Sequence, residues 1–142
     1  IVSRDPENAR LIRTAREVNN HKTDWVIDKI KLAAADANAV TGKKPKVACL
    51  GLAFKPNIDD LRESPALDVA QALLGQGYDL VAVEPNIESH SVIPLMDIDT
   101  AINQADVIAV LVKHREFLVP EVQKQMRECG ALDFCGALAD NL

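Results

Sequence analysis

Two cations, Lys55 and Arg62, lie in one polar stretch whose chemistry suits an anion. The stretch ends at Ser64-Pro65, a typical helix start, because serine caps free N–H groups and proline fits the first turn. A helix N-terminus carries a partial positive charge, to which Lys adds a mobile point charge and Arg a rigid fork of donors. Together these groups suit the oxygens of a phosphate or a carboxylate.

The same stretch allows a second interpretation of these two cations. Asp59, Asp60 and Glu63 lie between or beside them, so both cations could be solvated or paired with these carboxylates. Exposed pairs of this kind contribute little. Spacing alone favours this second interpretation and leaves the ligand unknown.

The remaining chemically versatile residues do not form a recognisable centre. The three cysteines have no C-x-x-C spacing and the three histidines stand far apart, so we predict no metal site. An odd number of cysteines is typical of a reducing compartment. We expect Cys49, within an apolar run, to be a buried inert thiol. His114 could orient a nearby loop, but we expect it to be a partly exposed structural residue.

Size and charge exclude several classes of protein. The chain has 142 residues, of which 48% are hydrophobic, and a formal net charge of −5. This fits one globular domain with its own core. The acidic balance argues against nucleic acid and anionic membranes as partners, since both require a basic surface. The apolar runs are too short for a transmembrane helix. Because the first residue is Ile1, we expect a fragment or a processed product.

Residues 1–42 are predicted to form a helical segment. Asp5-Pro6-Glu7 is a helix start signal, and apolar residues then recur at steps of three and four. The polar residues 19–24 indicate a break between two helices. Gly42 and Pro45 end the segment and mark a boundary before a second unit.

Residues 43–142 alternate between short apolar runs and helical patterns. We expect strands at 47–50, 80–83, 107–112 and 131–134, and helices from 64 to a stop at Gly77, at 97–104 and at 121–128. Strands without polar alternation are buried on both faces. The sequence therefore predicts an α/β fold, a Rossmann-like doubly wound parallel sheet preceded by the helical segment. Ligands bind such sheets beyond the carboxyl ends of the strands, where residues 51–65 lie.

The loop after the first strand departs from a dinucleotide site. Only Gly51 of the G-x-G-x-x-G fingerprint is present, and the next helix starts well beyond it. Glu84 ends the second strand, in the position of the acid that binds a ribose in dinucleotide folds. Without the glycines, we expect a Rossmann-like layout whose own task is not dinucleotide binding.

Residues 51–65, GLAFKPNIDDLRESP, resemble the signature that opens the C-terminal domain of the UDP-glucose/GDP-mannose dehydrogenase family. The family pattern is a strand, then G-x-A-[FY]-K, then D-x-R-x-S-P, and every element is present. Residues 83–87, 105–107 and 111–117 are similar to the branch that oxidises UDP-N-acetyl-D-mannosamine. Residues 15–19 are similar to the helix that precedes this domain.

The resemblance implies oxidation of a nucleotide sugar at C6, from alcohol to carboxylate, with NAD as the oxidant, to make a uronic acid for surface polysaccharide. It also implies a cytoplasmic homodimer with an N-terminal NAD domain and a catalytic cysteine upstream. None of the cysteines in this chain lies in the family's G-G-x-C-x-x-K-D context. We therefore assign no catalytic residue here and expect the isolated chain to be inactive.

Position within the motif assigns roles to the loop residues. Phe54 and Lys55 are implied to bind the UDP-sugar, and Arg62 to reach NAD held by the other domain. The resemblance thereby reverses the preference for solvated cations. Cys135 stands where an arginine commonly helps to bind the sugar, and Lys113 where an acid is common. The motif therefore specifies the family and leaves the sugar open.

A function of another class stays open. The helical segment could drive dimerisation, with the α/β part as a passive scaffold, which would make the chain a non-catalytic interaction module. A sensor of the receiver type is disfavoured, because it needs acidic residues after the first strand and Gly51-Leu52-Ala53 provides none.

Overall fold

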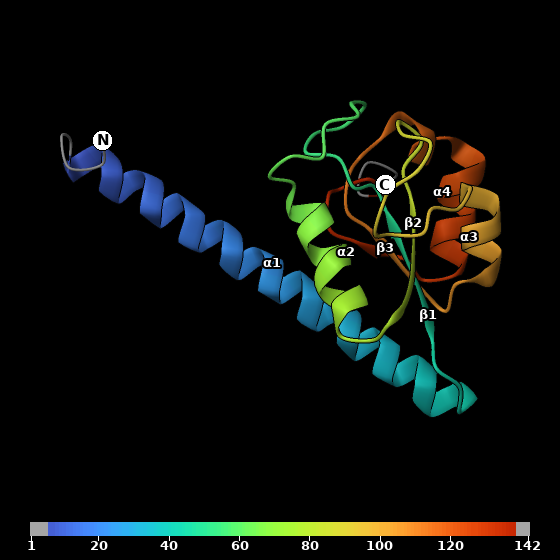
Figure 1. Cartoon of the computed structure of the whole chain (residues 1–142). Coiled ribbons are helices and arrows are strands. Elements are labelled where there is room, and N and C mark those ends of the chain that lie inside the picture. The colour runs from blue at the N-terminus through green and yellow to red at the C-terminus, as the bar shows by residue number, and fades with distance from the viewer. Residues whose placement is uncertain (1–5, 139–142) are drawn as a thin grey trace.

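The computed structural model describes residues 6–138, with side chains described from residue 22 onward (Figure 1). The expected strands and helices are all present. In chain order the elements are α1 (Pro6–Thr41), β1 (Lys46–Leu50), α2 (Pro65–Gly75), β2 (Asp79–Val83), α3 (Ile98–Gln104), β3 (Val107–Val110), the short 3-10 helix η2 (Arg115–Phe117), α4 (Pro120–Glu128) and β4 (Leu132–Asp133).

The four strands form one parallel sheet in the order β2-β1-β3-β4. Val47 of β1 lies beside Leu80 of β2 and Val107 of β3. Successive residues of a strand point to opposite faces. Val47 and Cys49 accordingly pack on one side of the sheet, and Ala48 and Leu50 on the other.

Helices cover both faces of this sheet. The second half of α1 packs with α2 on one face through Val26, Ile30 and Leu73. On the other face α3 and α4 contribute Ala101 and Met126. Figure 1 shows these two layers, with α1 and α2 on one side and α3 and α4 on the other. The predicted doubly wound α/β fold is confirmed.

The predicted break in the first helical segment is wrong, because α1 is continuous from Pro6 to Thr41. The polar residues at 19–24 include no glycine or proline, and each costs a helix only a few tenths of a kcal/mol. Burial of Val26, Ile30 and Ala34 directly after that stretch stabilises the helix there. The helix ends before Gly42, whose φ is 71°. Asp5, the predicted cap, lies outside the described residues. No described helix is both long and apolar enough to cross a membrane.

Candidate functional site

The loop between β1 and α2 leaves the sheet at its carboxyl edge through Gly51. The φ of Gly51 is 97°, in the left-handed region that favours glycine. A Cβ at this position would lie 2.5 Å from Cβ of Val112 and 3.0 Å from its backbone nitrogen. Only glycine therefore lets β1 turn this closely past the segment that follows β3.

Both ends of the loop are fixed by hydrogen bonds. The backbone N–H groups of Leu52 and Ala53 donate to Oε1 of Glu84 at 2.9 and 3.0 Å. At the far end, Ser64 Oγ donates to the carbonyl of Leu52 at 2.7 Å and accepts from the N–H of Leu67 at 3.3 Å. Ser64 is thus both the cap of α2 and a bond across the base of the loop.

Glu84 is a buried carboxylate that accepts hydrogen bonds from several groups of the protein. Its Oε2 accepts from the backbone and side-chain nitrogens of Asn86 at 3.0 and 3.1 Å. Burial acts to raise the pKa of Glu84, but hydrogen bonds from His114 and from the Leu52 and Asn86 N–H groups outweigh it. The pKa is lowered from 4.5 to about 2. Both carboxylate oxygens therefore accept hydrogen bonds from the protein itself, which leaves them unsuited to bind a ribose.

His114 is fully buried, so the expectation of a partly exposed residue is wrong. Its Nδ1 lies 2.8 Å from the backbone nitrogen of Asn57, which can only donate. The ring proton is therefore on Nε2, which donates to Glu84 Oε1 at 2.8 Å. The physical reason for the burial is position, because His114 lies just beyond β3 and its ring packs near that of Phe117, with 5.6 Å between centroids.

The two residues assigned to the UDP-sugar lie on the exposed part of the loop. Phe54 is 48% exposed. Lys55 is exposed, and its Nζ lies 5.8 Å from the centroid of the Phe54 ring. A cation over an aromatic ring at this distance is weakly attracted to it. The pair presents an apolar face and a positive charge at one point.

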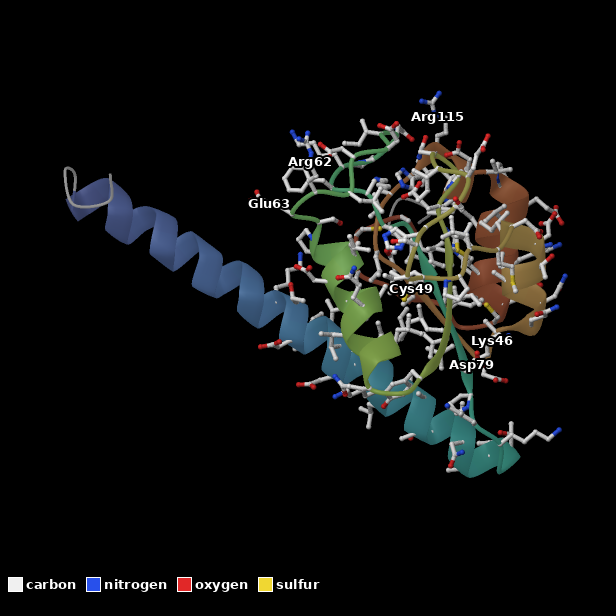
Figure 2. All side chains as sticks on the ribbon, viewed as in Figure 1. Lys46, Cys49, Arg62, Glu63, Asp79 and Arg115 are labelled. Atoms are coloured by element: carbon white, nitrogen blue, oxygen red, sulfur yellow. The ribbon has the colours of Figure 1, made fainter. Side chains whose placement is uncertain are left out.

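Arg62 is paired with Asp60, as the second interpretation of the cations expected. Its Nε and Nη2 donate to Oδ1 and Oδ2 of Asp60, both at 3.0 Å. These hydrogen bonds lower the pKa of Asp60 to about 2. The Arg62 side chain is nevertheless 89% exposed. Figure 2 shows Arg62 and Glu63 on the outer side of the loop.

A hollow of about 410 Å³ lies beside the loop, where the carboxyl ends of β1, β3 and β4 meet α1 and α2. Phe54 lines it, whereas Lys55 and Arg62 do not. The structure thus brings one of the three predicted binding residues to the hollow. The lining residues are Lys22, Thr23, Val26, Ala53, Phe54, Pro56, Pro65, Ala66, Val69, Leu111, Val112, Lys113, Phe134 and Cys135.

The cysteines are free thiols. Cys49 lies inside the sheet (Figure 2), and burial raises its pKa to about 12. Burial is also the main cause that raises the pKa of Cys135, which lines the hollow, to about 11. Both are protonated at neutral pH and so lack the thiolate that a nucleophile requires. Among the side chains that the structure describes, no three His, Cys, Asp or Glu residues group as a metal site.

The sequence pointed to Glu84 and His114 separately, but it missed Asn57 and the hydrogen bonds that join the three residues. A signal was present, since Glu84 follows β2 and His114 follows β3. Both strands are neighbours of β1 in the sheet. Residues that follow parallel strands of one sheet lie at the same edge of that sheet, so these two side chains could be expected on either side of the end of β1.

Known proteins resemble this chain in sequence. A model described as "UDP-glucose/GDP-mannose dehydrogenase family, UDP binding domain" matches residues 48–140. UDP-N-acetyl-D-mannosamine dehydrogenase of Escherichia coli (strain K12) is 50% identical over 129 residues, which cover 84% of this chain and 30% of that protein. An NDP-N-acetyl-D-galactosaminuronic acid dehydrogenase of Ralstonia nicotianae is 44% identical over 122 residues, covering 82% and 28%.

Solved structures resemble it as well. The native structure of a UDP-N-acetyl-mannosamine dehydrogenase from Staphylococcus aureus matches with a TM-score of 0.62 and 32% identity, covering 80% of this chain and 26% of that one. The chain spans only about 30% of the length of the E. coli relative. The remaining part of that relative has no counterpart among the residues described above.

Proposed function

This chain belongs to the UDP-glucose/GDP-mannose dehydrogenase family, in its UDP-binding domain, and from that premise we propose its role in a larger enzyme. We propose that it is the C-terminal UDP-sugar-binding part of an NAD-dependent UDP-N-acetyl-D-mannosamine 6-dehydrogenase. That enzyme oxidises the C6 alcohol to a carboxylate, making a uronic acid for surface polysaccharide. The NAD domain and the catalytic cysteine come from outside this chain, which supplies substrate binding and is inactive alone.

The observation that carries this proposal is a loop with a fixed backbone and exposed binding groups. Glu84 and Ser64 hold its two ends, while Phe54 and Lys55 remain accessible. A loop ordered before the ligand arrives loses less conformational entropy on binding. In the proposed complex the Lys55 ammonium meets the diphosphate, and the Phe54 ring lies against the nucleotide sugar beside the hollow.

Arg62 is assigned to NAD held by the facing domain. NAD supplies the hydride acceptor, and its pyrophosphate is anionic. The residues present fit such a partner, because Asp60 orients the guanidinium at two N–H groups while its side chain stays 89% exposed. Arg62 therefore acts as an electrostatic contact and transfers no atoms.

We further propose that residues 1–42 are the end of a central domain, that residues 43–142 form the UDP-sugar domain, and that the enzyme is a cytoplasmic homodimer. Trp25, Leu32 and Val40 are 50%, 59% and 86% exposed, and their spacing places them in one sector of α1. These three residues form an apolar stripe that exposed Lys29 and Asp36 interrupt, and we propose it as a protein contact. The free cysteines support a reducing compartment.

The same stripe supports a second candidate function, a non-catalytic module whose task is dimerisation through α1. The two candidates differ in one property. The enzyme domain binds UDP through the loop, whereas the passive scaffold does not.

Calorimetric titration of UDP into the 142-residue chain tests the proposed function. We expect saturable binding that Lys55→Ala weakens by about tenfold, since a charge-assisted hydrogen bond contributes about 1.5–3 kcal/mol. Lys124→Ala, an exposed lysine of α4 on the other face of the sheet, is the matched control and leaves the affinity unchanged. Absence of binding at millimolar UDP, or equal affinity after Lys55→Ala, would contradict the proposal and favour the scaffold.

A further inference from the structure

We propose that His114 and Glu84 are positioning residues of the UDP-sugar site, which set the segment from Phe54 to Pro56 in its binding geometry. This inference rests on the proposed function, because it concerns the loop assigned to the substrate. Neither residue touches the substrate in this account. They act through the backbone of the loop.

Hydrogen bonds hold the segment from Phe54 to Pro56 on both sides. Before it, the N–H groups of Leu52 and Ala53 donate to Glu84 Oε1. After it, the N–H of Asn57 donates to Nδ1 of His114 at 2.8 Å. Glu84 and His114 are joined to each other at 2.8 Å. One buried pair therefore holds both anchor points of the segment.

The anchor at Asn57 has a left-handed backbone conformation. Its φ is 65°, in a region that glycine and asparagine adopt far more readily than other residues do. Its side-chain Oδ1 accepts from the N–H of Arg115 at 2.8 Å. Asn57 is thus held to the segment after β3 by both its backbone and its side chain, and the turn follows from those bonds.

Histidine meets two hydrogen-bonding requirements at position 114. The site needs an acceptor toward the Asn57 N–H and a donor toward the Glu84 carboxylate. A neutral imidazole with its proton on Nε2 provides both in one rigid ring. Because His114 is fully buried, the ring cannot satisfy these groups through solvent instead.

Two substitutions distinguish the two hydrogen bonds of the His114 ring, one with Asn57 and one with Glu84. His114→Asn places an amide oxygen near the position of Nδ1 and keeps the acceptor for Asn57. His114→Gln places an amide nitrogen near the position of Nε2 and keeps the donor for Glu84. Calorimetry should give UDP affinity within about twofold of the original chain for His114→Asn, and about fivefold weaker for His114→Gln, the loss typical of one hydrogen bond. Equal affinities for the two variants would overturn the inference.

A combined variant tests whether His114 acts through the loop. In a Lys55→Ala background, His114→Gln should weaken UDP binding by clearly less than fivefold, because Lys55 is gone and Phe54 is the one assigned binding residue left for it to position. A further fivefold loss in that background would overturn the inference. A purely structural role would give that additive result.

Asn57→Ala tests the same anchor without touching the core. It removes the Oδ1 acceptor and disfavours the positive φ at an exposed position, so the fold survives. We expect UDP affinity to fall several-fold, with a drop of only about 3–6 °C in melting temperature and a cooperative transition. Unchanged affinity would contradict the inference.

Hydrogen exchange separates failure of this inference from failure of the proposed function. The Asn57 amide should exchange faster in His114→Gln than in His114→Asn, whether or not the chain binds UDP. A chain with this exchange difference but no UDP binding would refute the function and leave the anchor in place. Equal exchange rates with intact UDP binding would refute the anchor alone.

Discussion

At the scale of single residues, the site depends on contacts between positions far apart in the chain. Glu84 reaches loop amides about thirty positions before it, and His114 reaches an amide fifty-seven positions before it. The sequence motif predicted the loop and assigned binding roles to Phe54, Lys55 and Arg62, because these residues lie close together along the chain. The contacts of Glu84 and His114 could not be predicted in the same way. They depend on the order of the strands in the sheet, which the local sequence does not specify.

Gly51→Ala is expected to destabilise the domain by about 3 kcal/mol, through backbone strain and the clash with Val112. Gly42→Ala is the matched control. Gly42 also has a positive φ, of 71°, but nothing lies within 4 Å of its added Cβ, so the cost there is about 1 kcal/mol. Urea unfolding of both variants measures the difference. Equal losses would contradict the account of the turn.

The pKa of Glu84 predicts an acid-sensitive stability. The pKa is about 2 in the folded chain against 4.5 normally, so the carboxylate contributes stability that is complete above about pH 5. That contribution, on the order of 3 kcal/mol, is lost as the pH falls toward 2. Urea unfolding at several pH values should show a flatter acid dependence for Glu84→Gln than for the original chain. Parallel curves would contradict the assignment.

At the scale of elements, packing decides what local patterns leave open. The strands were predictable because runs such as residues 107–110 are apolar throughout, as burial on both faces requires. The continuity of α1 was not, since it depends on how Val26 and Ile30 pack against α2. Local sequence at 19–24 carries no information on that contact.

Ile30→Ala is expected to cost about 2–4 kcal/mol, because Ile30 is fully buried where α1 meets the core. Leu32→Ala, on the same helix but 59% exposed, should stay within about 0.5 kcal/mol of the original chain. Thermal and urea unfolding measure both. Similar values for the two variants would mean that α1 is not part of this core.

At the scale of the whole molecule, the net charge does not show where the positive charges lie. A chain of net charge −5 presents Lys55 on an exposed loop, and Lys22 and Lys113 at the adjoining hollow. Overall composition argues against polyanions as partners but does not locate these cations. The apolar stripe on α1, defined by Trp25, Leu32 and Val40, likewise became visible only in the folded chain.

The stripe predicts self-association of the chain. Sedimentation velocity should show a dimer whose fraction rises with concentration, and Leu32→Glu should shift it toward monomer. Val92→Glu places the same charge on another exposed apolar residue, 56% accessible and outside α1, and should leave the dimer intact. A monomer at every concentration would contradict the homodimer.

The central claim, that the loop after β1 binds the nucleotide of a UDP-sugar, is tested most directly by mapping amide chemical shifts of the isotope-labelled chain during UDP titration. The account predicts saturable changes concentrated at residues 52–57 and around the hollow that Phe54 lines, with little change in α3 and α4. No change at millimolar UDP, or changes confined to α3 and α4, would contradict it.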